Sequence, residues 1–129
     1  MTPDALDDAA LQFLTDRHLA TLSTPRPDGT VHVVPVGFSY EASRRLVRII
    51  TFAGSWKARH LTANPGTGVT VGQIDGGRWM SLEGRATVTD DPARVAAAVD
   101  RYAARYRQPE PRPDRVAIEI EVTRVLGRW

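Results

Sequence analysis

The stretch Thr51-Phe-Ala-Gly54-Ser55-Trp-Lys57-Ala-Arg59-His60 joins the end of an apolar segment to the start of a polar one. Residues 46–52 are rich in β-branched side chains, which is typical of a strand. Gly54 permits a turn, and a helix is expected to begin at Ser55. Asn64-Pro-Gly66 then stops that helix. The stretch therefore predicts a strand, a glycine turn and a short helix in direct succession.

The start of this predicted helix carries cations where helices usually carry acids. No Asp or Glu occurs within residues 51–72, whereas Lys57 and Arg59 lie in the first turn. A helix N-terminus has unpaired N–H groups and a partial positive charge, so each cation there costs about 0.3–1 kcal/mol. A bound anion reverses that cost. Two interpretations stay open, namely a phosphate site made of Thr51, Ser55, Lys57 and backbone N–H groups, or a solvated basic helix.

Strands and turns occupy most of the chain on either side of this unit. Turn signals at Pro25–Gly29 and Asp75–Gly77 join consecutive strands tightly, so we expect antiparallel pairing. Alternating apolar side chains need one shared core, which a small β-barrel provides. We predict a mostly β, single split-barrel domain over residues 1–129, with about six antiparallel strands and three helices. The expected strands are 18–24, 31–40, 46–52, 67–74, 78–89 and 116–126, and the expected helices are 2–14, 55–63 and 92–107.

Single residues carry further positional predictions. Pro35 cannot donate to a strand ladder, so its strand should lie at an edge or end nearby. Gly84 inside a strand indicates a bulge or a close backbone approach. Thr2 and Asp91 each precede a proline and are expected to cap the following helices. Solvated charges are expected at Arg44, Arg45, Arg48, Arg94, Arg101, Arg105 and Arg107.

Composition narrows the classes of function. The 129 residues are 42% hydrophobic and 25% charged, which is an ordinary globular balance. The lack of cysteine excludes disulfides, thiolate metal sites and thiol nucleophiles. No apolar run approaches the roughly 18 residues of a membrane span, and the acidic N-terminus does not resemble a signal peptide, so we expect a cytoplasmic protein. A net charge of +2 argues against a general nucleic-acid binder.

Motifs of several enzyme classes are missing. The sequence has no nucleophile elbow, no P-loop and no G-x-G-x-x-G segment. His18, His32 and His60 are scattered without a close acidic partner, so no metal site is expected, and His32 is either without a chemical role or part of a pocket wall. The residues that flank the fourth and fifth strands form either a polar sheet face or the far wall of a ligand cleft: Gln73, Arg78, Trp79 and Arg85. No catalytic residue is assigned.

Several segments together resemble a known family. They are Arg17–Thr24, His32–Phe38, Ile49–Thr51 with Ser55–Ala58, Asp75–Ala86, and Arg101–Arg107 with its proline-rich sequel. The chain resembles the pyridoxamine 5'-phosphate oxidase-like split β-barrel oxidoreductases, which bind FMN or a deazaflavin. The segments 75–86 and 101–113 make it most similar to the F420-dependent biliverdin reductases of that group.

The resemblance implies a cofactor held in a groove between the two barrels of a homodimer. It implies that Thr51, Ser55 and Lys57 bind the phosphate, and that Gly54, in the turn between Thr51 and Ser55, also belongs to the cofactor site. It further implies ring contacts by the backbone of Val33, Pro35, Val36 and Gly37, contacts from the partner subunit by Gln73 and Trp79, and Arg59 or Arg78 as candidates for the acidic tail of F420. The chain ends at Trp129, earlier than the resemblance leads us to expect, so no C-terminal contact is assigned.

The implied reaction is hydride transfer from reduced F420 to a conjugated small-molecule acceptor, with biliverdin as a candidate. Two alternatives stay open, namely an FMN-dependent oxidoreductase of the same fold, and a non-catalytic protein that binds flavins, deazaflavins or tetrapyrroles. Trp56 stands where the oxidase branch has a basic residue, which weakens the assignment to FMN oxidase chemistry. The protein's contribution would be orientation and electrostatics, because the cofactor carries the redox chemistry.

Overall fold

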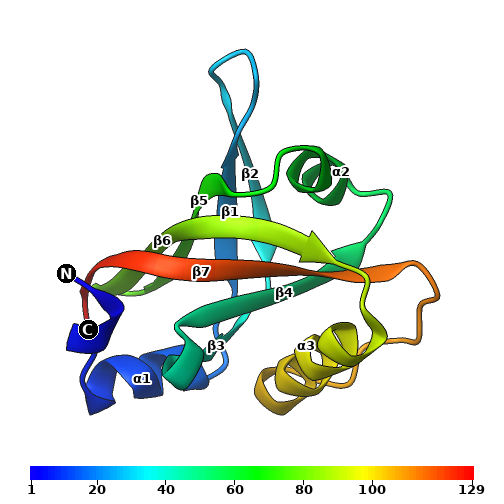
Figure 1. Cartoon of the computed structure of the whole chain (residues 1–129). Helices are drawn as coiled ribbons and strands as arrows, with labels where there is room; N and C mark the ends of the chain where they lie inside the picture. Colours follow the sequence, from blue (N-terminus) through cyan, green and yellow to red (C-terminus); the bar gives the residue numbers. More distant parts are fainter.

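The computed structural model describes all 129 residues and arranges them around one antiparallel sheet of seven strands. The strand order is β2-β1-β5-β6-β7-β4-β3, and the sheet coils into a barrel with helices around it (Figure 1). The strands are β1 (Ala20–Pro25), β2 (Val31–Val36), β3 (Ser39–Glu41), β4 (Leu46–Phe52), β5 (Thr67–Asp75), β6 (Arg78–Thr89) and β7 (Arg115–Arg128). The helices are α1 (Asp8–Thr15), α2 (Trp56–Ala63) and α3 (Pro92–Arg105), and two 3₁₀ turns are η1 (Pro3–Ala5) and η2 (Ala42–Arg44). The predicted mostly β architecture with three helices is confirmed.

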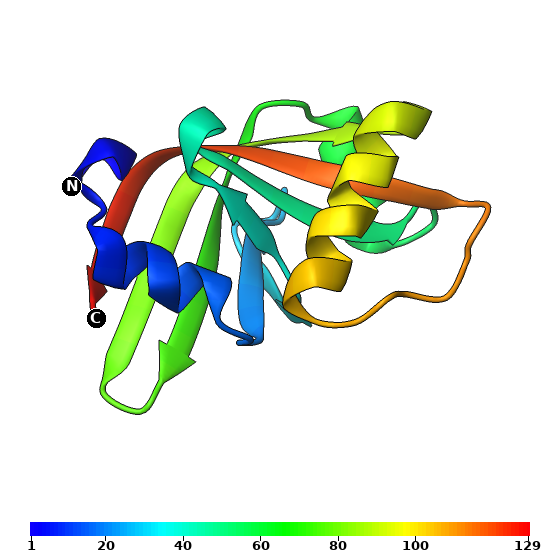
Figure 2. The same cartoon turned by 90° about the horizontal axis from the view of Figure 1, so that it is seen from below.

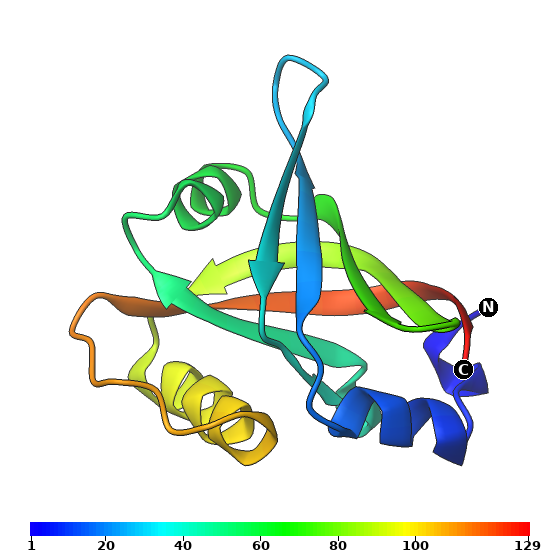
Figure 3. The same cartoon turned by 180° about the vertical axis from the view of Figure 1, so that it is seen from behind.

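The two edge strands of the sheet, β2 and β3, follow one another in the chain. The barrel is therefore closed by the chain segment that connects β2 to β3, since these two strands are not hydrogen-bonded to each other. Its core contains the fully buried side chains of Phe13, Phe38, Leu22 and Ile118, each of which contributes about 1.5–3 kcal/mol through burial. The view from below shows α1 and α3 on the same side of the barrel (Figure 2). From behind, the β1–β2 hairpin projects beyond the barrel near α2 (Figure 3).

The predicted strand 31–40 is wrong in its continuity, because the chain breaks into β2 and β3 at Gly37 and Phe38. A Cβ atom on Gly37 would lie 2.8 Å from the ring of Tyr102, so the helix α3 approaches the backbone closely here. The Tyr106 hydroxyl accepts a hydrogen bond from the Phe38 N–H at 3.1 Å. These contacts turn the chain from one sheet edge to the other. The position of Pro35 on the edge strand β2 confirms the prediction made for it.

Two of the three local predictions on glycine and helix caps are confirmed. The ladder between β6 and β7 shifts register at Gly84, where a Cβ atom would lie 2.2 Å from the Glu121 carbonyl oxygen. Asp91 caps α3 by accepting from the Arg94 N–H at 3.0 Å. The Thr2 prediction is wrong, because Asp7 caps α1 and the Thr2 side chain makes no cap bond. None of the helices has the length and apolar character that crossing a bilayer requires.

Two arginines predicted to be solvated are buried: Arg48 is 6% exposed and Arg105 is 9% exposed. Both lie where α3 packs on the outer side of β3 and β4, a packing that the sequence pattern does not specify. Arg48 forms an ion pair with Glu41 at 2.8 Å. Arg105 has no carboxylate partner and donates its hydrogen bonds to neutral oxygens instead. The amphipathic pattern of the helix correctly predicts a packed face but not which arginines border it.

Candidate functional site

A pocket of about 290 Å³ lies where the end of β4, the start of α2 and the end of β2 meet. It brings together five of the predicted cofactor residues: Pro35, Val36, Gly37, Thr51 and Lys57. The structure adds residues that the sequence analysis did not assign to a site: Ile50, Phe52, Tyr102, Pro109, Arg112 and Arg115. We call this pocket the basic pocket, because three of its side chains are cationic and none is acidic.

The start of α2 is built as the sequence predicts. Ser55 is its N-terminal cap, and the hydroxyl oxygen accepts from the Ala58 N–H at 3.2 Å. The same oxygen lies 3.1 Å from the Thr51 hydroxyl, and the Ser55 N–H donates to the Phe52 carbonyl at 3.0 Å. These bonds hold the end of β4 against the first turn of α2. The first N–H groups of the helix are left without helical partners, which is the usual basis of an anion site.

Lys57 is the strongest sign of a ligand in this pocket. Its side chain is partly buried, and no carboxylate lies within ion-pair distance of it. Burial lowers the pKa of Lys57 because the charged form loses water without gaining a counter-ion. A phosphate placed here would supply that counter-ion together with acceptors for the helix N–H groups. The donor set therefore fits a phosphate group.

Arg112 and Arg115 reach the pocket through the pairing of β7 with β4. Arg115 is the register partner of Phe52, one residue after Thr51. The guanidinium of Arg112 lies 4.2 Å from the ring centroid of Phe52. One signal for these residues lies in the sequence: a strand that pairs antiparallel with β4 must bring its first residues beside the end of β4. Antiparallel pairing of two strands distant in the sequence could not be assigned from that pattern alone.

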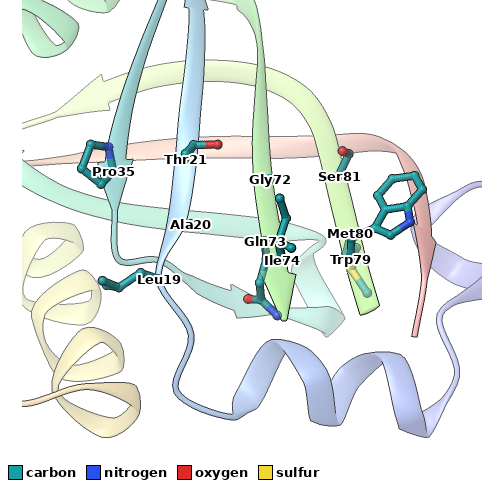
Figure 4. Close-up of a pocket in the computed structure, with 10 residues that line it drawn as sticks. All are labelled: Leu19, Ala20, Thr21, Pro35, Gly72, Gln73, Ile74, Trp79, Met80 and Ser81. Carbon is teal, nitrogen blue, oxygen red and sulfur yellow. The ribbon is translucent and has the colours of Figure 1, made fainter. Parts of the chain in front are cut away.

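A second, more apolar pocket of about 410 Å³ lies on the outer face of β1, β5 and β6 (Figure 4). Its rim includes Leu19, Ile74 and Trp79, which are 60%, 75% and 40% exposed. Gly72 leaves the centre of this face without a side chain. Pro35 borders both this pocket and the basic pocket, so the two are adjacent. Large exposed apolar side chains gathered around a hollow are typical of a binding or association surface.

The remaining predicted residues lie in different places. Gln73 borders the apolar pocket, but its amide donates to the Phe13 carbonyl at 2.9 Å and accepts from Arg105 at 2.6 Å. Arg78 pairs with Asp75 at 2.5 Å. Arg59 borders a separate groove between α2 and β6 that also contains Asp90. Two further predicted residues border neither pocket: Val33, which is 54% exposed on β2, and Gly54, which lies in the turn before α2.

An aromatic stack fixes the start of α2 against the β1–β2 hairpin. Trp56 lies between His32 and His60, with ring centroids 4.5 Å and 4.6 Å away. Desolvation, helped by the nearby charges of Arg26 and Lys57, lowers the pKa of His32. His32 thus has a structural role next to the basic pocket. No group of three His, Cys, Asp or Glu side chains is arranged to hold a metal ion.

Comparison with known proteins identifies the family of the chain. A family model described as pyridoxamine 5'-phosphate oxidase matches residues 6–128. An F420H(2)-dependent biliverdin reductase from Mycobacterium tuberculosis (strain CDC 1551 / Oshkosh) is 48% identical over 126 residues, which cover 98% of this chain and 90% of that protein. A solved structure described as an F420 reductase is similar with a TM-score of 0.72 and 26% identity, covering 94% of this chain and 98% of that chain.

A conserved hypothetical protein from Mycobacterium tuberculosis has a TM-score of 0.78 at 23% identity, covering 95% of this chain and 84% of that chain. At this identity the likeness concerns the fold alone, and it supports the split barrel described above. The family match, in contrast, includes β4, α2 and every residue that borders the basic pocket. From its sequence and its fold together, this chain belongs to the pyridoxamine 5'-phosphate oxidase family.

Proposed function

We propose that the protein is a cytoplasmic F420H2-dependent reductase that acts as a homodimer on a conjugated small-molecule acceptor such as biliverdin. The observation that carries the proposal is the 48% identity, over 98% of this chain, to an F420H(2)-dependent biliverdin reductase. The basic pocket supports it, because its donors and its unpaired lysine suit the phosphate of such a cofactor.

In this proposal Lys57 supplies the charge for the phosphate, and the first N–H groups of α2 supply hydrogen bonds. Thr51 borders the same pocket and supports the site by donating its hydroxyl proton to the Ser55 oxygen. Ser55 has a double role. Its oxygen caps the helix through Ala58, and its hydroxyl proton is available to an anionic oxygen. Gly54 lies in the turn that joins the end of β4 to the start of α2. The phosphate would thus be bound by residues that the fold already holds in place.

The ring of the cofactor would lie along the backbone of Pro35, Val36 and Gly37, which borders the basic pocket, with Val33 further along the same edge strand. Trp79 is proposed as the contact from the partner subunit, since it borders the exposed apolar pocket and needs a covering surface. Gln73 would support that pocket from beneath, because both ends of its amide are engaged within its own barrel. The apolar pocket would exclude water from the reacting groups.

When bound, the reduced deazaflavin supplies a hydride for an electron-poor carbon of the acceptor. The chain's own contribution would be to orient the ring through the 35–37 backbone and to hold the charged end in the basic pocket. A conjugated acceptor is favoured because Leu19, Ile74 and Trp79 offer flat, apolar contact area beside Gly72.

The experiment that tests the proposal has two steps. First, the purified protein is titrated with F420 and, separately, with FMN, following cofactor fluorescence. Second, reduced F420 is supplied with biliverdin, and its oxidation and the loss of biliverdin absorbance are followed together. We expect tighter binding of F420 than of FMN, and turnover that depends on both reactants.

Each other outcome would replace the proposal with a stated alternative. Preference for FMN would place the protein in the flavin branch of the family. Tight binding of F420 without turnover of biliverdin or other conjugated acceptors would indicate a non-catalytic binding protein. Binding of neither cofactor would overturn the proposed function and leave the family membership intact.

A further inference from the structure

The basic pocket holds more positive charge than a single phosphate requires. Lys57, Arg112 and Arg115 all border it, and no carboxylate does. Arg112 has Asp114 as its counter-ion, at 2.7 Å. Arg115 has no ion pair at all. With one phosphate paired to Lys57, the pocket keeps unneutralised arginine charge, which indicates that a second anionic group binds there.

The segment that carries the two arginines is held in place before any ligand arrives. The Ala53 N–H donates to the Asp114 carbonyl at 2.9 Å, which ties this segment to the turn between β4 and α2. Arg112 is stacked on the Phe52 ring, and Arg115 pairs with the same residue in the sheet register. Ordered arginines lose less conformational entropy on binding than mobile ones do. The segment 112–115 therefore has the properties of a prepared subsite.

We propose that Arg112 and Arg115 form a second anionic subsite that binds the carboxylates of the tail attached to the cofactor's phosphate. This inference rests on the proposed function, since it needs a cofactor whose phosphate lies at Lys57. The phosphate of F420 is a diester that continues into an acidic tail, so the tail begins at the phosphate subsite itself. Arg112 is 45% exposed, which suits a tail that runs outward from the pocket into solvent.

The two arginines have a second candidate ligand, namely the carboxylate groups of the acceptor. The acceptor must reach the ring, and the proposed ring position at Pro35–Gly37 leads toward the apolar pocket. Arg112 and Arg115 lie with Thr51 and Lys57, at the phosphate end. The position of the two arginines thus favours the tail.

The proposal also replaces Arg59 and Arg78 as candidates for the tail. Arg59 borders the groove on the other side of α2 and is not among the residues of the basic pocket. Arg78 already forms an ion pair with Asp75 at 2.5 Å and stacks on Phe13 at 4.7 Å. Arg112 and Arg115 are the arginines that share a pocket with Lys57.

The test compares two probes on two proteins. The probes are F420 with several glutamates in its tail and the deazariboflavin 5'-phosphate, which has the ring and the phosphate but no tail. The proteins are the full chain and its Arg112→Gln/Arg115→Gln variant, with Arg44→Gln as a control that removes one exposed charge from η2. Fluorescence titration gives each Kd, and repetition at two salt concentrations gives the electrostatic contribution.

We expect the double variant to bind F420 roughly tenfold or more weakly, because a charge-assisted bond to each arginine is lost. Binding of the tail-free phosphate should change little, and the salt dependence for F420 should fall. Arg44→Gln should bind both probes as the unmodified chain does. Equal weakening for both probes would overturn the proposal, since the arginines would then serve the phosphate or the fold.

A further experiment distinguishes binding of the cofactor's tail from binding of the acceptor's carboxylates. The KM for biliverdin and for its dimethyl ester is measured at saturating reduced F420. If the double variant keeps its affinity for F420 and raises the KM only for free biliverdin, the subsite belongs to the acceptor and the proposal is overturned. Failure of the proposed function looks different, because the unmodified chain would then bind neither deazaflavin probe.

Discussion

Two cationic regions meet at the turn between β2 and β3, and they differ in whether their charges have partners. On one side Arg105, 9% exposed, donates to the Asp16 carbonyl at 2.9 Å, the Phe38 carbonyl at 2.7 Å and the Gln73 amide oxygen at 2.6 Å. On the other side Lys57 has no protein acceptor. Because a buried donor without an acceptor costs free energy, the first region stabilises the fold and the second is suited to a ligand.

The Arg105 region joins four parts of the chain. Its guanidinium bonds to the end of α1, to the β2–β3 turn and to β5, and Tyr106 beside it donates to the His18 carbonyl at 2.6 Å. Burial lowers the pKa of Arg105, but the group stays charged because its normal value is so high. The charge is stabilised by oriented neutral dipoles and by the Phe38 ring, whose centroid lies 4.6 Å away.

The largest effect is expected from Arg105→Met. The substitution removes the only protein donor to the Gln73 amide oxygen, while the Phe38 carbonyl keeps the Tyr106 hydroxyl at 3.2 Å and the Asp16 carbonyl keeps His18 Nδ1 at 3.1 Å. An unpaired buried acceptor costs about 1–3 kcal/mol and each lost bond to a charged group about 1.5–3 kcal/mol, so we expect a loss of about 3 kcal/mol or more in the free energy of unfolding. Urea unfolding followed by tryptophan fluorescence measures it.

Arg107→Met is the matched control for that experiment. Arg107 is exposed two residues beyond the end of α3 and its side chain makes no hydrogen bond or ion pair, so its loss should change stability by less than about 0.5 kcal/mol. Similar, small losses in both variants would show that the Arg105 bonds are not stabilising.

The second largest effect is expected on cofactor binding, in the region around Lys57. Lys57→Ala should raise the Kd for F420 by roughly thirty- to a hundredfold, about 2–3 kcal/mol, because the phosphate loses its charged partner. The free energy of unfolding without cofactor should stay the same or rise slightly, since the lowered pKa of Lys57 means that its charge is a burden to the unliganded fold.

Arg59→Ala removes a cation from the same helix but from the opposite groove, and it should bind F420 nearly as the unmodified chain does. A matching loss of binding in both variants would mean that the general charge of α2 attracts the cofactor. A parallel loss of stability and binding in Lys57→Ala would mean that Lys57 supports the fold.

The contrast also explains how far the sequence could be interpreted. The helix start near Ser55, the bulge at Gly84 and the edge position of Pro35 could be predicted, because each depends on the backbone preferences of one or two residue types. The absence of acids over residues 51–72 was visible in the sequence, and the basic pocket has no acidic side chain. The burial of Arg105 was not, since its three acceptors come from α1, the β2–β3 turn and β5.

The residues added to the candidate site follow the same logic. Arg115 and Arg112 enter the basic pocket only through the pairing of β4 with β7, which are separated by most of the barrel in sequence. Tyr102 enters it through the packing of α3 beside Gly37. Strand existence can be predicted from alternation, but the choice of partner strand depends on the whole core.

A third effect is expected where the two regions touch. Gly37→Ala places a methyl group 2.8 Å from the Tyr102 ring and 3.1 Å from the Tyr106 ring, so the turn or the helix end must shift. We expect a loss of about 1–2 kcal/mol in unfolding free energy, measured by urea titration, together with weaker binding of F420. The companion variant Gly37→Ala/Tyr102→Leu should recover part of both losses. No recovery would place the cause in the backbone of the turn and not in the contact with α3.

The smallest effect is a pH dependence of stability that comes from the His32–Trp56–His60 stack, next to Lys57. Desolvation and the charges of Arg26 and Lys57 lower the pKa of His32 below its ordinary value, so the unfolded chain binds a proton first as pH falls. The contribution of neutral His32 is therefore present above about pH 6.5 and is lost as pH falls below it.

His32→Gln removes this titration and should give a Tm that depends less on pH. We expect the Tm of the unmodified chain, relative to the variant, to fall by on the order of 2 °C between pH 7.5 and 5.5. The comparison with the variant isolates the contribution of His32 from that of every other group in the chain. An unchanged difference in Tm across this range would show that the protonation of His32 does not affect the stability of the fold.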